Sequence, residues 1–381
     1  MNLIRTLHVT ESHAKADGGV TTVVNDLTSH LHDLGVYSCV LAATDHDEPT
    51  PDGVDFIKMG TRCNAMSALF SSELKVSLRT VILDKKINLI HIHGVWMPLQ
   101  IIASRLAKEM GISFVITSHG MLEPWLWKGK GWLGFIKKKL YFSLVAYPAY
   151  QYASCTHAIT PDESDSLCQY FPKNKQVTIP NAIDFPNEKP RETEAKYGQV
   201  VFFIGRLNPV KGVDLLLHAF DKAKLPSCWK LIVAGPEEVP EYVEELHEYV
   251  KEHGLQSQVE FVGSVYGEEK EQCYRRAWVT VVPSYSEVVG MVNLEASVLK
   301  CPTITTHATG LRDWEEGGGI LVNPDVEELT SVLKSVTAWS EGERQQRGEA
   351  SSELVKNKYA WGVVGDQWMT LYSDILRGKQ V

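Results

Sequence analysis

Residues 281–296 form the stretch that decides the fold class, and they read VVPSYSEVVGMVNLEA. The first part is apolar and β-branched, which predicts a strand, and the second part has the spacing of a helix that begins near Gly290. A strand that leads through a loop into a helix is the unit from which parallel α/β sheets are built. Glycine at the helix start lets backbone N–H groups approach a phosphate without an intervening side chain.

Two carboxylates belong to the same stretch. Glu287 stands in the loop, and Glu295 lies on the helix more than one turn beyond Gly290. Two carboxylates close to an anion site make sense if their targets are sugar hydroxyls, because a carboxylate accepts hydrogen bonds and does not bind phosphate. For each residue alone the alternative is more common: Glu287 caps the helix, and Glu295 is a solvated surface charge.

A second strand-to-helix connection carries positive charge. The apolar residues 200–204 predict a strand, Gly205 and Arg206 follow it, and Lys211 and Gly212 stand at the start of the next helix. Two cations beside a helix amino terminus suit a diphosphate. The alternative, with equal weight on this segment alone, is a surface arginine and lysine that flank a turn.

The same alternation runs along the whole chain of 381 residues. We expect strands near residues 3–9, 38–42, 89–92, 114–117 and 157–159, and again near 200–204, 230–234, 259–262, 279–282 and 303–305, with helices between them. Residues 184–196 are polar and broken by proline, which is typical of a linker. The pattern predicts an α/β protein with a first domain at 1–183, a second at 197–360 and a C-terminal helix, 361–381, that joins the first domain. Ligands are expected at the carboxyl ends of the strands and in the cleft that the two domains face.

Composition narrows the class of protein further. Apolar residues make up 44% and charged residues 22%, which excludes wholesale disorder. The net charge of −9 gives no general attraction to nucleic acid, so we expect no nucleic-acid partner. Seven cysteines without CxxC spacing suit reduced thiols better than disulfides or a zinc site. No apolar run of about 18 residues and no signal peptide is found, so we expect a cytoplasmic protein.

Several motifs, taken in order, resemble glycosyltransferase family 4. This family consists of retaining enzymes that use nucleotide-sugars and have the GT-B fold, with two Rossmann-like doubly wound domains that face a cleft. Besides the two stretches above, the matching motifs are Gly18-Gly19-Val20, HIHG at 91–94, TSHGMLEPW at 117–125, IPNAID at 179–184, AGP at 234–236, FVG at 261–263 and GGILVNP at 318–324.

The resemblance implies a role for each matching residue. Arg206 and Lys211 would neutralise the donor diphosphate, Glu295 would hold the ribose, and Glu287 and His119 would contact the transferred sugar. The catalytic residues would then be Glu287, His119, Arg206 and Lys211. The remaining donor-binding residues would be the Gly18–Gly19 turn over the phosphates, Gly235, Val262 against the base, and the backbone of Gly290, Met291 and Val292.

The resemblance implies neither a cofactor nor a metal ion, and the usual Glu-Gly-Phe-Gly is replaced by EVVG at 287–290. Taken from the residues alone, His119 can simply cap a turn. His91 and His93 alternate along a strand and therefore share a face. Their spacing could suit a metal, but the sequence reveals no third ligand, so a structural or cleft-lining role is favoured.

The segment 124–161 differs in charge from the rest of the chain. It contains no Asp or Glu, and it holds Lys128, Lys130 and the run 137–139, interleaved with the aromatic residues Trp125, Trp127, Trp132, Phe135 and Tyr141. It could dock on anionic lipid at the inner face of the cell membrane. A partly buried helix with snorkelling lysines is the slightly favoured alternative, because three successive lysines do not share one face.

The predicted function is therefore transfer of a sugar from a nucleotide-sugar to a saccharide acceptor. By family tendency the donor is a UDP-sugar, with GDP-mannose as the second candidate. The stretch from His119 to Trp125 resembles family members that build bacterial exopolysaccharide, which implies a lipid-linked oligosaccharide acceptor. Two alternatives stay open: a sugar-nucleotide epimerase, and a non-catalytic subunit that binds a sugar-nucleotide.

Overall fold

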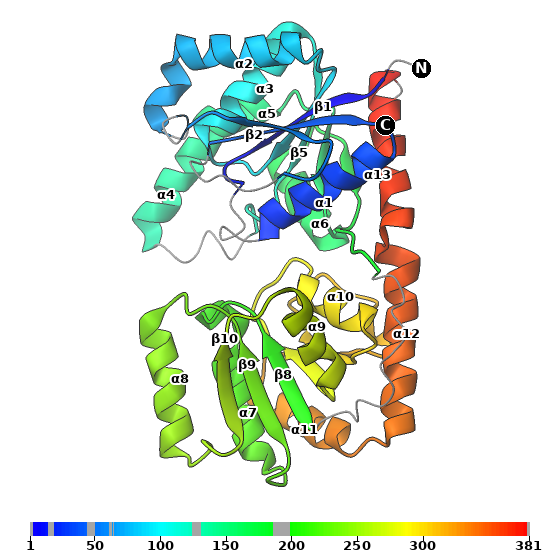
Figure 1. The fold of residues 1–381 in the computed structure, drawn as a ribbon. Helices are drawn as coiled ribbons and strands as arrows, with labels where there is room; N and C mark the ends of the chain where they lie inside the picture. The colour runs from blue at the N-terminus through cyan, green and yellow to red at the C-terminus, as the bar shows by residue number, and fades with distance from the viewer. Residues whose placement is uncertain are drawn as a thin grey trace. The chain divides into compact units, whose positions relative to one another are not determined.

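The computed structural model describes residues 3–13, 19–43, 50–60, 63, 65–123, 131–185 and 199–378. The chain divides into two compact units (Figure 1). Unit 1 comprises Met1–Ala182 together with Trp361–Val381, and unit 2 comprises Ile183–Ala360. Most of the expected linker, residues 186–196, lies outside the described residues, as do Gly18 and residues 124–130.

Unit 1 is built on a seven-stranded parallel sheet with the order β3-β2-β1-β4-β5-β6-β7. The chain fills one side of the sheet from β1 to β3 and the other side from β4 to β7, so the topological switch point lies between β1 and β4. The strands are β1 (Arg5–Thr10), β2 (Tyr37–Ala42), β3 (Asp55–Lys58), β4 (Leu89–His93), β5 (Ser113–Thr117), β6 (Cys155–Ala158) and β7 (Gln176–Thr178).

Most helices of unit 1 cover the apolar faces of this sheet, whereas the helix Gly131–Tyr141 has no buried side chain. They are α1 (Gly19–Asp33), η3 (Met66–Phe70), α2 (Ser72–Asp84), α3 (Pro98–Met110), α4 (Gly131–Tyr141), the π-helical turn η5 (Phe142–Ala146), α5 (Tyr147–Tyr150), α6 (Pro161–Tyr170) and α13 (Trp361–Leu376). Helix α13 lies beside α1 and shares a core with it that includes Leu27, Leu31, Trp368 and Tyr372 (Figure 1). The last helix of the sequence is thus part of the first unit.

Unit 2 repeats the plan with a six-stranded parallel sheet, β10-β9-β8-β11-β12-β13, whose switch point lies between β8 and β11. Its strands are β8 (Val200–Ile204), β9 (Lys230–Ala234), β10 (Val259–Gly263), β11 (Val279–Val282), β12 (Thr303–Thr306) and β13 (Ile320–Val322). Its helices are η6 (Pro209–Lys211), α7 (Val213–Ala223), α8 (Pro240–Glu252), α9 (Gly267–Arg276), α10 (Met291–Val298), η7 (Trp314–Gly317), α11 (Val326–Thr337) and α12 (Glu341–Tyr359).

The two doubly wound sheets confirm the predicted fold class, and every expected strand is found within a few residues of its expected place. The elements that were not predicted include the short strands β3, β7 and β13 and the helix α12. Strand β3 is short and only half-buried, and α12 has very few apolar residues along its 19 positions. Within the described residues, no helix has the length and apolar character needed to span a membrane.

Candidate functional site

The carboxyl ends of β8, β9 and β10 in unit 2 are locked together through glycines. The N–H of Gly205 donates to the Ala234 carbonyl at 3.0 Å, and the N–H of Gly235 donates to the Gly263 carbonyl at 2.8 Å. Gly235 has φ +142°, and a Cβ built there would overlap the carbonyl oxygen of Gly205. Only glycine at position 235 allows the chain after β9 to pass this close to the backbone after β8, and this contact fixes the direction in which the chain leaves β8. Val262, at the end of the edge strand β10, is exposed beside this contact.

The turn that carries Lys211 lies against the loop that follows β11. Gly212 has φ +68°, and a Cβ there would overlap the carbonyl oxygen of Pro283. The N–H of Tyr285 donates to the carbonyl of Val210 at 2.8 Å. The sequence predicted an anion site on each of two separate loops, and these contacts bring the two loops together.

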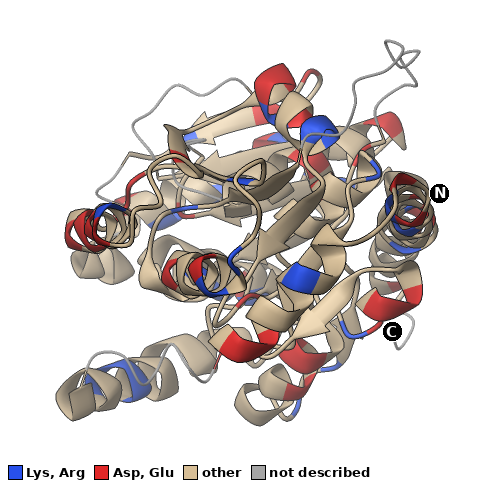
Figure 2. Cartoon of the chain, turned by 90° about the horizontal axis from the view of Figure 1, so that it is seen from below, with Lys and Arg blue, Asp and Glu red and all other residues tan. Residues whose placement is uncertain are grey.

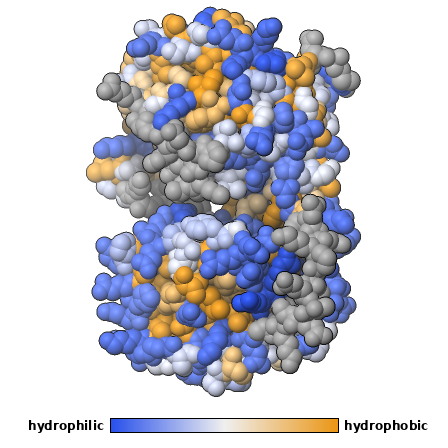
Figure 3. All heavy atoms as spheres, in the orientation of Figure 1, coloured by the Kyte–Doolittle hydropathy of each residue, from blue (hydrophilic) through white to orange (hydrophobic). Residues whose placement is uncertain are grey.

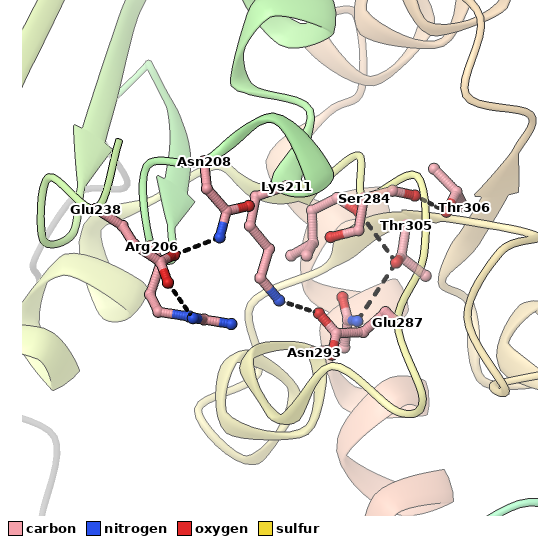
Figure 4. A network of polar contacts seen from close by, with 10 residues as sticks. Arg206, Asn208, Lys211, Glu238, Ser284, Glu287, Asn293, Thr305 and Thr306 are labelled. Atoms are coloured by element: carbon pink, nitrogen blue, oxygen red, sulfur yellow. Dashed lines mark hydrogen bonds and ion pairs between the residues drawn. The ribbon is translucent and has the colours of Figure 1, made fainter. Parts of the chain in front are cut away.

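Lys211 and Glu287 form an ion pair across these two loops (Figure 4). Their side chains are only 18% and 20% exposed. Glu287 therefore does not cap the following helix, and the alternative of a helix-capping glutamate is wrong.

Helix α10 begins at Met291, directly after Gly290, which has φ +68°. The prediction of a helix start near Gly290 is confirmed. The N–H of Asn293 donates to the Gly290 carbonyl at 2.8 Å. The N–H groups of Met291 and Val292 precede the first α-helical hydrogen bonds, and the Gly290 N-cap has no side chain to accept from them. Because the N-terminus also carries the positive end of the helix dipole, this turn is suited to an anion.

Arg206 points into the same region from the end of β8 (Figure 4). Its Nη1 lies 2.6 Å from Oε1 of Glu238, and the Asn208 side-chain amide donates to the other oxygen of that carboxylate. The Arg206 and Glu238 side chains are 56% and 39% exposed. The guanidinium of Arg206, which the sequence assigned to a diphosphate, is thus paired with a carboxylate of the protein itself. No sequence signal pointed to Glu238.

Glu295 is held from two sides. Nζ of Lys270 lies 3.0 Å from Oε1, and the hydroxyl of Tyr274 donates to Oε2 at 2.7 Å. Burial raises the pKa of Tyr274 well above its usual value, so this hydroxyl remains a donor. The alternative of a solvated surface charge is wrong for Glu295, whose carboxylate is fixed in direction.

Two buried polar atoms below the loop between β11 and α10 have no hydrogen-bond partner in the described part of the chain. They are Oγ of Ser284 and Oδ1 of Asn293. The amide nitrogen of Asn293 lies 3.4 Å from Oγ1 of Thr305, and Thr306 donates to the Ser284 carbonyl at 2.6 Å (Figure 4). Ser284 Oγ and Asn293 Oδ1 are thus available to form a hydrogen bond with a bound molecule.

In unit 1, His119 follows β5 and has φ +51°, a conformation uncommon for a residue other than glycine. The carboxylate of Glu163 bonds to both neighbours of His119, to the side chain of Ser118 and to the backbone of Gly120. Ser118 Oγ and the Gly120 N–H donate to Oε1 at 2.5 and 2.7 Å, and the Ile159 N–H donates to Oε2 at 2.7 Å. Glu163 lies in the first turn of α6, where the sequence suggests only helix capping, so sequence reasoning missed it.

A cluster of histidines and a small pocket lie beside His119 at the switch point of unit 1. One ring nitrogen from each of His8, His91 and His93 lies within 4.8 Å of the other two. The third histidine, His8, is on the neighbouring strand β1 in register with His91. The sequence alone did not reveal it, because only the strand order brings His8 beside His91. A pocket of about 20 Å³, room for about one water molecule, is lined among others by His91, His93, His119, Asn181 and Trp368.

Gly19 is the first residue of α1.

Two family models match the chain. The model described as Glycosyl transferases group 1 matches residues 184–354, and the model described as Glycosyltransferase Family 4 matches residues 17–185. An uncharacterized glycosyltransferase of Methanocaldococcus jannaschii is 27% identical over 241 residues, which are 58% of this chain and 60% of that protein. A D-inositol 3-phosphate glycosyltransferase of Mycobacteroides abscessus is 32% identical over 167 residues, 40% of this chain and 36% of that protein. The chain thus spans about half the length of the curated relatives it matches.

Solved structures resemble the whole chain. Sucrose-phosphate synthase from Thermosynechococcus elongatus has a TM-score of 0.79 at 18% identity and covers 99% of this chain and 100% of its own. HepE of Anabaena, solved in complex with UDP and glucose, has a TM-score of 0.77 at 18% identity, with 97% and 100% covered. At this identity the likeness establishes the fold.

The two doubly wound parallel-sheet units, together with the likeness of the whole chain to these solved structures, give the chain the GT-B fold. Together the two family models span residues 17–354, and the chain belongs to glycosyltransferase family 4. The predicted family and fold are confirmed.

Proposed function

We propose that this protein is a retaining glycosyltransferase that moves a sugar from a nucleotide-sugar to a saccharide acceptor. The observation that carries the proposal is in unit 2: Arg206, Lys211 and the open N-terminus of α10 gather at the carboxyl ends of the strands around the switch point. Ligands of open α/β sheets bind at this place. Cations and helix N–H groups there suit a diphosphate.

The chemistry follows from where charge develops. As the bond between the anomeric carbon and the diphosphate oxygen breaks, the leaving group gains negative charge and the sugar gains oxocarbenium character. Arg206, Lys211 and the N–H groups of Met291 and Val292 bind that charge more strongly in the transition state than in the ground state. The acceptor oxygen bonds to the face that the leaving group vacates, and its proton passes to a leaving phosphate oxygen. Because these fixed cations neutralise the diphosphate, the transfer needs no metal ion, and activity should survive EDTA.

The other assigned residues complete the donor site. Glu295, held by Lys270 and Tyr274, would accept hydrogen bonds from the two ribose hydroxyls. Val262 and Gly235 would border the base, Glu287 and His119 would contact the transferred sugar, and the Gly18–Gly19 turn would approach the phosphates. A UDP-sugar is the favoured donor, which the complex of HepE with UDP supports, and GDP-mannose is second.

The test is turnover of purified variants. Lys211→Ala should lose about 10²–10³-fold in kcat, the usual effect of removing one group that stabilises a developing oxyanion, and should remain folded by circular dichroism. Lys222→Ala is the matched control. Lys222 lies on α7, the helix that Lys211 precedes, and it forms an exposed ion pair with Glu327 of α11. Wild-type turnover in Lys211→Ala would refute the assignment.

Product analysis separates the alternatives. An epimerase would convert the donor to a second nucleotide-sugar without any acceptor, whereas a transferase releases UDP in proportion to acceptor glycosylation. A non-catalytic subunit would bind UDP, seen as a rise in Tm with ligand concentration, and release nothing.

We further propose that the acceptor is lipid-linked and that α4 contacts an anionic membrane. No side chain of α4 is buried, and Trp132, Leu133 and Leu140 are among its exposed apolar residues. Figure 2 shows that the described charges on this helix are all basic, and Figure 3 shows hydrophobic and hydrophilic side chains mixed on the surface. An exposed helix with apolar and basic side chains suits the interface of an anionic bilayer. The seven free cysteines support a reducing compartment, which is consistent with the cytoplasmic face.

Flotation with vesicles tests this contact. Binding to phosphatidylcholine vesicles that contain phosphatidylglycerol should exceed binding to phosphatidylcholine alone, and W132S/L133S should reduce it at least fivefold. V76S/L83S, at exposed apolar positions of α2, is the matched control. No binding at low salt, or equal loss in both double variants, would refute the membrane proposal.

A further inference from the structure

Three histidines form a continuous hydrogen-bonded column that ends at His119. Nδ1 of His8 lies 3.0 Å from Nε2 of His93, and Nδ1 of His93 lies 3.0 Å from Nε2 of His119. Each pair of rings is stacked, with centroids 5.3 Å apart in both cases. His8 and His93 are fully buried. The three residues come from β1, β4 and the end of β5, which are neighbours in the sheet.

The column is anchored at its inner end by Thr6. Oγ1 of Thr6 lies 3.1 Å from Nε2 of His8 and 3.2 Å from the carbonyl oxygen of Tyr37. Oγ1 of Thr6 also lies 3.1 Å from Oγ of Ser38. A carbonyl can only accept, so all three contacts are satisfied when Thr6 donates its one proton to Tyr37 and accepts from both Ser38 and His8. His8 therefore carries its proton on Nε2 and offers a lone pair on Nδ1.

The direction of the remaining bonds follows from this anchor. Burial lowers the pKa of His8 to about 3 and that of His93 well below its usual value, so each of these rings carries one proton. His93 must donate from Nε2 to His8 and accept at Nδ1. His119 must then donate from Nε2, and its Nδ1 has no partner among the described residues.

With these donors and acceptors, every ring nitrogen of the His8, His91 and His93 cluster has a hydrogen-bond partner without a metal ion. Both nitrogens of His8 and of His93 are used within the column. Those of His91 are bonded to the Tyr372 hydroxyl and to Oγ1 of Thr117, each at 2.7 Å. A metal ion would have to break several of these bonds in a fully buried place.

We propose that His93 and His8 are positioning residues that hold His119 in the Nε2–H tautomer, so that its Nδ1 accepts a hydrogen bond from a hydroxyl of the transferred sugar. The inference rests on the proposed function. Glu163 bonds to the Ser118 hydroxyl and to the Gly120 N–H on either side of His119, while the column fixes the His119 ring, so ring and main chain are both positioned before a ligand arrives. A bare lone pair also repels a carboxylate, so the site should favour donor sugars that present a hydroxyl to His119 over those that present an acid.

Nitrogen NMR of the tautomer tests this without reference to turnover. In protein labelled with ¹⁵N-histidine, long-range ¹H–¹⁵N correlations distinguish the protonated nitrogen of each neutral ring, and His119→Gln identifies the His119 signals. We expect the wild-type protein to show His119 protonated at Nε2. Protonation of His119 at Nδ1 in the wild-type protein would overturn the proposal, whether or not the protein transfers sugar.

Variants of His93 separate positioning from mere packing. His93→Leu should abolish the fixed tautomer and lower kcat/KM by 10–100-fold. His93→Asn should keep the tautomer and most of the activity, because an amide oxygen near the place of Nδ1 still accepts from His119. Tyr372→Phe, which removes a hydrogen bond from the neighbouring His91, should leave the His119 tautomer unchanged. Equal loss of activity in His93→Leu and His93→Asn with an unchanged tautomer would overturn the role of the column. A fixed tautomer in a protein without transferase activity would instead refute the proposed function.

Discussion

Replacing Glu238 by Gln should strengthen the binding of UDP. The Glu238 carboxylate accepts hydrogen bonds from Arg206 and Asn208, so it is paired with the cation that the proposed function assigns to the diphosphate. The guanidinium of Arg206 cannot form its full set of hydrogen bonds with Glu238 and with a diphosphate at the same time. The diphosphate must therefore displace Glu238, and the energy of that contact is subtracted from the binding energy of UDP.

The size of the effect follows from exposure. The Arg206 and Glu238 side chains are 56% and 39% exposed, and exposed ion pairs contribute about 0–1 kcal/mol. Glutamine keeps the shape and removes the charge, so at most about 1 kcal/mol returns to ligand binding. At about 1.4 kcal/mol for each factor of ten, the Kd for UDP should fall by roughly two- to fivefold.

Isothermal titration calorimetry at a fixed salt concentration measures this change. Glu237→Gln is the matched control, because it removes the same charge one residue away and should alter the Kd by less than a factor of about 1.5 through long-range attraction. The reasoning is refuted if Glu238→Gln binds UDP no more tightly than Glu237→Gln. Weaker binding would show that Glu238 orients Arg206 for the ligand instead of competing with it.

Three further changes test the framework around the sites. Tyr372→Phe should lower the free energy of unfolding by about 1–3 kcal/mol, because it leaves Nδ1 of His91 buried without a donor; urea unfolding measures this. Burial, with nearby carboxylates, raises the pKa of Glu123 from 4.5 to about 7. The folded state therefore favours the protonated form, and stability should be lost as the pH rises from about 4.5 through about 7, so Glu123→Gln should raise the Tm at pH 8 more than at pH 4.5. Gly235→Ala should cost more than about 3 kcal/mol or prevent folding, because its Cβ would overlap the Gly205 carbonyl.

Matched substitutions control for general effects. Tyr152→Phe removes an exposed phenol hydroxyl and should leave the unfolding free energy within about 0.5 kcal/mol. Gly254→Ala adds a methyl group at φ +67° with open space around it, so only backbone strain of about 1–2 kcal/mol applies. A soluble, stable Gly235→Ala variant, a Tyr372→Phe variant as stable as Tyr152→Phe, or a Glu123→Gln effect independent of pH would each contradict its prediction.

Local sequence predicted the fold well because the information lies within each segment. The β-branched runs and helical spacings were enough to place the strands, and Gly290 alone marked the start of α10. Where a segment has no alternation of apolar and polar residues, as in the polar helix α12, the sequence pattern does not predict the element. The spacing of Arg206 and Lys211 likewise pointed to their shared turn, since they are only five residues apart.

What the sequence determined by itself is therefore the set of elements and the residue types at the ends of their strands. Only the tertiary structure decided which of those ends meet: Lys211 with Glu287, Arg206 with Glu238, and His8 with His93 and His119. The physical reason is that these contacts depend on strand order. In a doubly wound sheet β1 lies beside β4 and β8 beside β11, so side chains tens of residues apart become hydrogen-bond partners, and no local periodicity encodes that order.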